Sequence, residues 1–125
     1  MILEMDCGNS FLKWRVIAGA RVERSGVAET LEEIRQKVTG LQLEAGRLVS
    51  VRTAEETAAL CSGVETAWQI PVAVAASSES LAGVRNGYRE PQRLGLDRWL
   101  ALVAAYQLSG SACLVVDLGT AVTVD

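Results

Sequence analysis

The order of apolar and polar residues along this chain predicts an α/β protein. Short apolar or alternating runs bounded by turn residues are typical of strands. Such runs occupy residues 1–6, 11–17, 22–27, 47–52, 71–76 and 113–117, and a last one begins at residue 121. The first three are separated only by short turns, so they predict consecutive strands, of which the first two form a hairpin.

Helical signals lie between the later runs. Thr30 with Glu33, and Thr53 with Glu56, have the spacing of a capping box, in which a hydroxyl and a carboxylate bind the free amides at a helix start. The first box predicts a helix over residues 31–39. The second opens a helix whose predicted inner face consists of Thr57, Cys61, Val64 and Trp68.

A third helix is predicted over residues 96–109. It follows a polar segment, 77–94, that contains the breakers Asn86-Gly87 and Pro91. Three strands followed by alternating helices and strands predict an α/β fold, with a mixed sheet of about five strands and helices packed on it. The length of 125 residues predicts a single domain that is large enough to have its own core.

Composition and charge exclude several classes of protein. The net charge is −3 without a basic block, which argues against nucleic acid as a partner. The longest apolar stretch, residues 100–106, is far shorter than the roughly 20 residues that span a bilayer. No basic segment precedes the first apolar run, as it would in a secretory signal. We therefore expect a cytoplasmic protein that has no membrane partner.

The cysteines are expected to be structural. Histidine is absent, so a zinc site or a Cys-His nucleophile has almost no ligands to draw on. Cys7, Cys61 and Cys113 are odd in number and widely spaced. This pattern favours reduced thiols packed in the core over disulfides.

Residues with candidate chemistry gather in three places, and the first lies directly after the first strand. Residues 6–10 have the sequence DCGNS and are followed by Lys13. Gly8 permits close approach of the backbone to a ligand, the next two residues add polar side chains, and Lys13 is near enough to reach a phosphate. The alternative is an ordinary hairpin in which Asp6 accepts hydrogen bonds from the turn amides.

The second place, residues 117–123, repeats this arrangement with the sequence DLGTAVT. Asp117 follows three apolar residues, and a buried carboxylate is costly unless it is paired or bound to a cation. Gly119 and Thr120 add backbone amides and a hydroxyl, groups that can hold phosphate oxygens. Two such loops suggest a nucleoside triphosphate and its cation held between them. A hairpin in which Asp117 only caps amides is the alternative.

The third place is Gly95-Leu96-Asp97-Arg98, at the start of the predicted helix 96–109. Near phosphate loops, Asp97 would suit a base that accepts a hydroxyl proton during phosphoryl transfer. Arg98 would suit a carboxylate on the acceptor. On spacing alone, a helix-starting Asp97 favoured by the helix dipole, with a solvated Arg98, is the simpler interpretation.

Together the three segments resemble the type III pantothenate kinases, members of the actin, Hsp70, sugar-kinase and acetate-kinase superfamily. The matching patterns are Asp6-x-Gly8-Asn9-Ser10-x-x-Lys13, Tyr88-x-x-Pro91-x-x-x-Gly95-x-Asp97-Arg98 and Asp117-x-Gly119-Thr120-Ala121-x-Thr123-x-Asp125. The resemblance implies a ribonuclease H-like (actin-like ATPase) fold. It also implies ATP-dependent phosphorylation of the pantothenate hydroxyl to 4'-phosphopantothenate, the first step of coenzyme A biosynthesis.

The resemblance implies a role for each matching residue. Asp97 is implied to be the catalytic base. The residues implied to bind ATP are Asp6, Cys7, Gly8, Asn9, Ser10, Phe11, Leu12, Lys13 and Thr120; those implied to bind pantothenate are Tyr88, Gly95, Leu96, Asp97 and Arg98. Asp117 resembles the ligand of a monovalent cation, K⁺ or NH₄⁺, and Asp6 is implied to help hold the Mg²⁺ that accompanies ATP. The family is implied to be homodimeric, with the pantothenate pocket completed at the subunit interface.

The chain departs from the family pattern in two residues and in its length. Cys7 replaces an aliphatic residue and Ser10 replaces threonine, which keeps the hydroxyl. Family members are about double this length, so residues 1–125 resemble an amino-terminal half-domain that carries both phosphate loops and the pantothenate-binding segment. We expect that half alone to be inactive.

Two other functions stay open at this point. One is a non-catalytic nucleotide-sensing or transcription-regulating homologue on the same fold, and the other is a kinase of another small hydroxyl acceptor. Asp97 favours an enzyme, because a module that only binds nucleotide has no need of a base.

Overall fold

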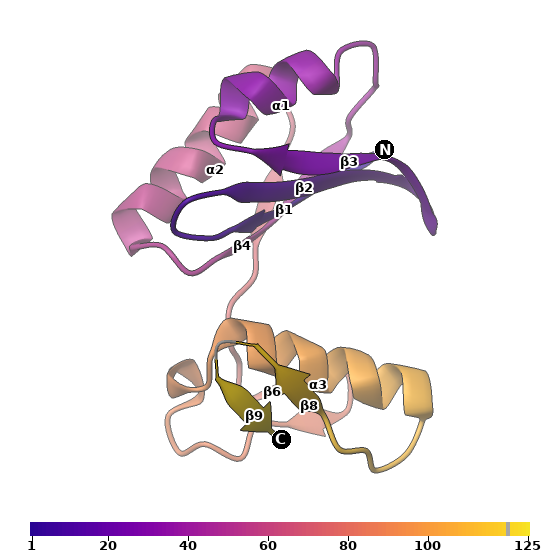
Figure 1. The fold of residues 1–125 in the computed structure, drawn as a ribbon, viewed down its shortest axis with the longest axis vertical. Coiled ribbons are helices and arrows are strands. Elements are labelled where there is room, and N and C mark those ends of the chain that lie inside the picture. Colours follow the sequence, from indigo (N-terminus) through magenta and orange to yellow (C-terminus); the bar gives the residue numbers. More distant parts are fainter. Residues whose placement is uncertain (120) are drawn as a thin grey trace. The chain divides into compact units, whose positions relative to one another are not determined.

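A computed structural model describes residues 1–119 and 121–125. The chain folds as two compact units, residues 1–75 and 76–125 (Figure 1), whose positions relative to one another are not determined.

A five-stranded mixed sheet forms the first unit. Its strands are β1 (Ile2–Cys7), β2 (Leu12–Ala18), β3 (Arg21–Ala28), β4 (Ala45–Ser50) and β5 (Val72–Val74), in the order β3-β2-β1-β4-β5. Neighbours among β1, β2 and β3 pair antiparallel, whereas β4 is parallel to both β1 and β5. The predicted mixed sheet of about five strands is therefore confirmed, and β1 and β4 end at the same edge.

Two helices, α1 (Leu31–Lys37) and α2 (Ala54–Trp68), cover one face of this sheet (Figure 1). Alternate residues of β1 and β2 point to the helices and are buried, as the period of two in a strand requires. The core joins residues from the strands and both helices: Leu3, Met5, Cys7, Leu12, Trp14, Val16, Ala28, Ile34, Val38, Leu48, Val64 and Ile70. This packing holds the ends of the strands in fixed register.

The capping signals of both helices are present in the structure. Thr53 and Glu56 form a complete capping box at α2, and the Thr30 side chain accepts the Glu33 amide at α1. The first helix is shorter than the predicted range 31–39: it ends at Lys37, and Val38 is its C-cap.

The second unit is built around α3 (Leu96–Ser109), with the bounds that the sequence predicted. A short ribbon of β6 (Ser80–Leu81) and β7 (Val84–Arg85) and a 3₁₀ turn, η1 (Pro91–Arg93), precede it. A second ribbon of β8 (Val116–Leu118) and β9 (Val122–Val124) follows. Leu94 and Trp99 are buried in this unit.

The predicted buried strand at 113–117 is wrong. Strand β8 begins at Val116, and its apolar side chains are exposed, as Leu118 at 79% shows. An apolar run predicts burial, but a two-stranded ribbon has no second layer to cover its faces. Cys113 is likewise exposed and Cys61 half-buried, so only Cys7 is a core thiol as predicted.

Within the described residues, every helix is too short or too polar to cross a bilayer.

Candidate functional site

The first candidate loop, residues 8–11, joins β1 to β2 at the edge where β1 and β4 both end. The Gly8 amide donates to the Phe11 carbonyl at 3.1 Å and closes the turn. Ligands of open α/β sheets bind beyond the carboxyl ends of the parallel strands. The predicted phosphate loop therefore lies at the edge of the first unit where a ligand is expected.

Burial divides the residues of this segment into two groups. Cys7 and Leu12 are buried in the core, so only their backbone can face a ligand. Asp6, Asn9, Ser10, Phe11 and Lys13 are exposed. Asp6 and Lys13 are partners in the β1–β2 register, which places a carboxylate and an ammonium group side by side on one face of the hairpin.

The Cys7 thiol is chemically inert in this position. Burial raises the pKa of Cys7 to about 11; the nearby Arg52 partly offsets this rise, and the carboxylate of Asp6 adds to it. The thiol is therefore protonated at neutral pH, and thiols react as thiolates. This agrees with a packing role for the side chain.

Sequence reasoning missed one residue that contacts this loop, Arg52. Its Nε donates to the Gly8 carbonyl at 2.7 Å. A single arginine after a strand carries no sequence signal. Only the parallel pairing of β1 with β4, which sets Cys7 opposite Ser50, brings Arg52 beside the loop.

The predicted catalytic residue lies in the second unit. Gly95 precedes α3, and Leu96, Asp97 and Arg98 form its first turn. Asp97 is exposed, and a Cβ at position 95 would lie 2.8 Å from its Oδ1. Glycine therefore makes room for the Asp97 carboxylate at the helix start, where the dipole favours negative charge.

Arg98 is not solvated, contrary to the simpler interpretation of the sequence. Its Nε donates to Asp125 Oδ2 at 2.8 Å, and its Nη2 donates to Oδ1 of the same carboxylate. The hydrogen bond to Asp125 is the main reason that the pKa of Arg98 is raised; burial opposes the rise, and the Tyr88 phenol adds to it. Tyr88 and Arg98, both predicted to bind substrate, are thus close enough for the phenol to act on the guanidinium.

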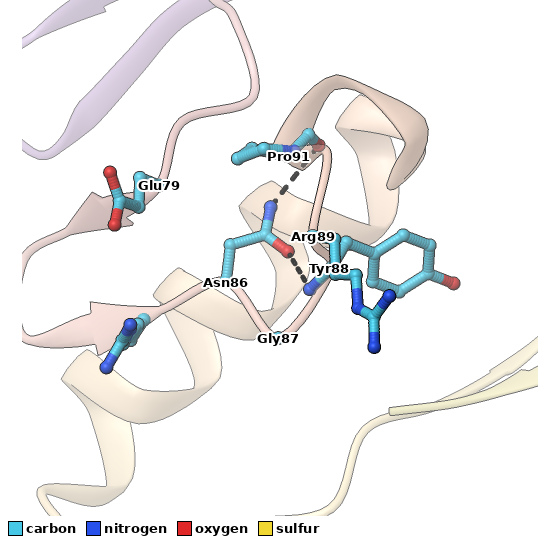
Figure 2. A pocket seen from close by; sticks show the side chains of 7 residues that line it. Glu79, Asn86, Gly87, Tyr88, Arg89 and Pro91 are labelled. Carbon is cyan, nitrogen blue, oxygen red and sulfur yellow. Dashed lines mark hydrogen bonds between the residues drawn. The ribbon is translucent and has the colours of Figure 1, made fainter.

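The residues around Tyr88 are ordered by Asn86, which is the buried polar side chain among the described residues. Its Nδ2 donates to the carbonyls of Ser78 and Pro91 at 3.2 and 3.3 Å, and its Oδ1 accepts the Tyr88 amide at 3.0 Å. Figure 2 shows Asn86 between Pro91 and the Tyr88 backbone. The Asn86-Gly87 pair, predicted only as a breaker, thus fixes the backbone that presents Tyr88.

This segment borders an open pocket of about 530 Å³. Its lining consists of Glu79, Arg85, Asn86, Gly87, Tyr88, Arg89 and Pro91 (Figure 2). The Tyr88 side chain is 43% exposed. A polar molecule with a carboxylate would meet the Tyr88 phenol and the guanidinium groups of Arg85 and Arg89 here.

The second candidate loop joins β8 to β9. Asp117 lies on β8 opposite Thr123 and is exposed. Thr120, predicted to contact ATP, lies outside the described residues. In the stretches 1–119 and 121–125, no three Asp, Glu, His or Cys side chains cluster as ligands for a metal ion. A cation here would need further ligands from phosphate, water or backbone carbonyls.

The predicted site residues are therefore shared between the two units. The first unit holds the ATP-binding segment from Asp6 to Lys13, and the second holds Tyr88, the start of α3 and Asp117.

The family model described as type III pantothenate kinase matches residues 2–125. The chain belongs to the type III pantothenate kinase family. It is 55% identical over 129 aligned positions to a curated type III pantothenate kinase of Pseudomonas aeruginosa strain PAO1, and 52% identical over 130 positions to that of Azotobacter vinelandii. Each match covers all of this chain and 52% of the relative. The chain thus spans about half the length of the type III pantothenate kinases it matches, and it has an α/β fold consistent with theirs.

Proposed function

We propose that this chain forms part of an ATP-dependent pantothenate kinase, which transfers the γ-phosphoryl group to the pantothenate hydroxyl and gives 4'-phosphopantothenate for coenzyme A biosynthesis. The observation that carries the proposal is the match of the family model to residues 2–125, which include every predicted site residue. The geometry supports it, because loop 8–11 lies at the ligand-binding edge of the sheet.

In this proposal the first unit binds the nucleotide. Backbone amides of loop 8–11 and the hydroxyl of Ser10 donate hydrogen bonds to phosphate oxygens, and the ammonium group of Lys13 offsets the negative charge of these oxygens. In phosphoryl transfer the protein forms few covalent bonds itself, so most of the rate enhancement comes from positioning the reactants and from electrostatic stabilisation.

The second unit binds and activates the acceptor. Tyr88 and Arg98 orient pantothenate, and the Asp97 carboxylate accepts the proton of the attacking hydroxyl. Arg98 keeps its geometry through Asp125, which holds two of its nitrogen atoms. Both hydrogens of Nη1 and the second hydrogen of Nη2 are then left to donate to a substrate carboxylate.

The exposed carboxylates fit the proposed cations. Mg²⁺ is commonly bound by one or two carboxylates together with substrate phosphates and water. Asp6, exposed at the end of β1, would hold it in this way, and Asp117 would hold K⁺ or NH₄⁺. When bound, these cations supply charge that offsets the repulsion among phosphate oxygens. The proposal includes the homodimer that the resemblance implies.

The test uses a chimera in which residues 1–125 replace the matching half of the Pseudomonas aeruginosa relative. The purified chimera, with ATP, Mg²⁺, K⁺ and pantothenate, is expected to produce 4'-phosphopantothenate, detected by mass spectrometry. The chimera with Asp117→Ala, in which Asp125 is unchanged, should be activated less by K⁺ than the chimera that retains Asp117. A folded chimera that consumes ATP only with another hydroxyl acceptor would contradict the proposed substrate.

A further inference from the structure

Arg52 connects the end of β4 to the loop that follows β1. Its Nε donates to the Gly8 carbonyl at 2.7 Å, and the neighbouring Val51 amide donates to the Cys7 carbonyl at 3.2 Å. A hydrogen bond from a charged donor is roughly twice as strong as a neutral one. Two successive residues after β4 thus hold two successive carbonyls at the start of loop 8–11.

Arg52 is itself held by α2. Its amide donates to Ser50 Oγ at 3.1 Å, and the hydroxyl of Thr57 bonds the same oxygen at 2.8 Å. Thr57 lies in the first turn and a half of α2, whose capping box fixes that end of the helix. The chain of contacts runs from α2 through Ser50 and Arg52 to Gly8, and it is half-buried along its length.

Arg52 makes no direct ion pair within residues 1–119 and 121–125, although, after the hydrogen bonds from Thr53, its charge helps to lower the pKa of Glu56. The ion pairs of the described stretches, which include Arg47 with Glu4 and Arg93 with Glu90, do not involve Arg52. A half-buried guanidinium that no carboxylate contacts directly is expected to favour an anion nearby. Beside a turn whose residues Asn9 and Ser10 are exposed, the anion of matching chemistry is a phosphate group.

We propose that Arg52 is a positioning residue of the nucleotide site: it clamps the Gly8 carbonyl so that loop 8–11 keeps the shape that receives the phosphates of ATP, and its charge favours that anion. The inference rests on the proposed nucleotide binding. It adds a residue from the β4–α2 connection to a site otherwise built from the β1–β2 hairpin. The clamp acts through the loop, so it should affect ATP and leave pantothenate unaffected.

The first measurement tests the clamp in the 125-residue chain without any ligand. Backbone amide exchange of Gly8 is compared by NMR in the wild type, Arg52→Met, Arg52→Lys and Arg35→Met. The last variant is the matched control, because Arg35 is an exposed arginine of α1 whose ion pair within the described residues is with Glu32. Exchange at Gly8 should accelerate about tenfold in Arg52→Met, the scale of one lost charged hydrogen bond. Arg52→Lys should recover part of the protection, and Arg35→Met should match the wild type.

The second measurement tests the nucleotide role in the chimera. Calorimetry gives the Kd of MgATP, which should rise about tenfold or more in Arg52→Met. The KM for pantothenate should stay within twofold of the wild type, and Arg52→Lys should bind MgATP better than Arg52→Met. Arg35→Met should bind as the wild type does.

The outcomes separate this inference from the proposed function. An unchanged Kd for MgATP in Arg52→Met would overturn the inference, and so would a parallel rise in the pantothenate KM, which indicates a general structural defect. A wild-type chimera that binds MgATP but does not phosphorylate pantothenate would count against the proposed function alone. The exchange and nucleotide measurements would still decide the role of Arg52.

Discussion

At the scale of single residues, the proposed chemistry depends on Asp97. Its carboxylate is exposed in the first turn of α3, beside the glycine that leaves room for it. In the chimera, Asp97→Asn should lower kcat by about 10²–10⁴, the usual contribution of a general base. The Kd of MgATP should be unchanged. Glu65→Gln, the same type of change on the exposed surface of α2, is the control. Turnover near that of the wild type in Asp97→Asn would show that Asp97 only starts the helix and is not the base.

Asn86 carries a second prediction at this scale. Asn86→Ala removes three side-chain hydrogen bonds and leaves the Tyr88 amide and two carbonyls without these partners. Such a loss costs about 1–3 kcal/mol of stability for a buried group. Because Tyr88 is then held less firmly, the KM for pantothenate in the chimera should rise while the Kd of MgATP stays constant. Val64→Ala, which destabilises the core of the first unit, should not raise the pantothenate KM.

The candidate residues that the sequence predicted are those whose type and spacing carry a local signal. Asp6, Lys13 and Asp97 belong to this group, because they stand near the end of β1, the start of β2 and the start of α3 respectively. Arg52 and Asp125 could not be assigned their contacts in this way. Each contacts a residue far away in sequence, Gly8 and Arg98 respectively, and such pairs arise only when the fold brings the elements together.

At the scale of elements, the capping box of α2 makes a direct prediction. The Thr53 hydroxyl accepts the Glu56 amide at 3.2 Å, and hydrogen bonds from Thr53 lower the pKa of Glu56. Thr53→Ala should therefore destabilise the chain by about 1 kcal/mol, measured by urea unfolding. Thr66→Ala makes the same chemical change within α2 but away from its cap. An equal loss in both variants would show that the box contributes nothing.

The ion pair between Arg98 and Asp125 joins α3 to the end of the second ribbon and predicts a pH dependence. The pKa of Asp125 is lowered, chiefly by its hydrogen bond from Arg98. A carboxylate whose folded pKa lies below its unfolded pKa stabilises the fold above the unfolded value, near 3.9, and loses this effect as the pH falls through the folded value.

Thermal unfolding of the wild type and Asp125→Asn from about pH 7 to pH 2 measures this effect. The wild type should be the more stable protein at neutral pH, and the difference should shrink toward zero at the acid end. A difference that stays constant across this range would show that the pair is not the cause.

The elements show where pattern alone succeeds and where it fails. The helix predicted at about 96–109 has these bounds in the structure, because its apolar face repeats every three to four positions; Gly110, in the left-handed conformation, is its C-cap. The ribbon of β6 and β7 was missed, because two-residue strands are too short to show alternation. The burial predicted for 113–117 is wrong. Hydrophobic residues tend to be buried, but their sequence does not show whether another part of the fold lies over them.

At the scale of the whole molecule, the two units contribute different parts of the proposed reaction. The first has a closed core between its sheet and two helices and presents the nucleotide loop. The second presents the acceptor residues and ends in a ribbon with exposed apolar side chains, namely Val116, Leu118, Val122 and Val124; Leu114, just before the ribbon, is exposed as well. Exposed apolar surface of this kind promotes association. The second unit is therefore the part of the chain that we expect to drive self-association in solution.

The last prediction concerns residues 1–125 without any further sequence. The relatives are type III pantothenate kinases of which this chain matches only 52% of the length, so the remaining half of those proteins has no counterpart here. We expect the 125-residue protein to bind triphosphate weakly through loop 8–11 and to produce no 4'-phosphopantothenate above background. The chimera, assayed at the same concentration of ATP, Mg²⁺, K⁺ and pantothenate, should turn over. Because transfer needs the nucleotide and acceptor held in one fixed geometry, losing part of the surrounding surface should reduce the rate far more than the binding. Robust turnover by the 125-residue protein, with its mass verified, would show that these residues alone form a complete site.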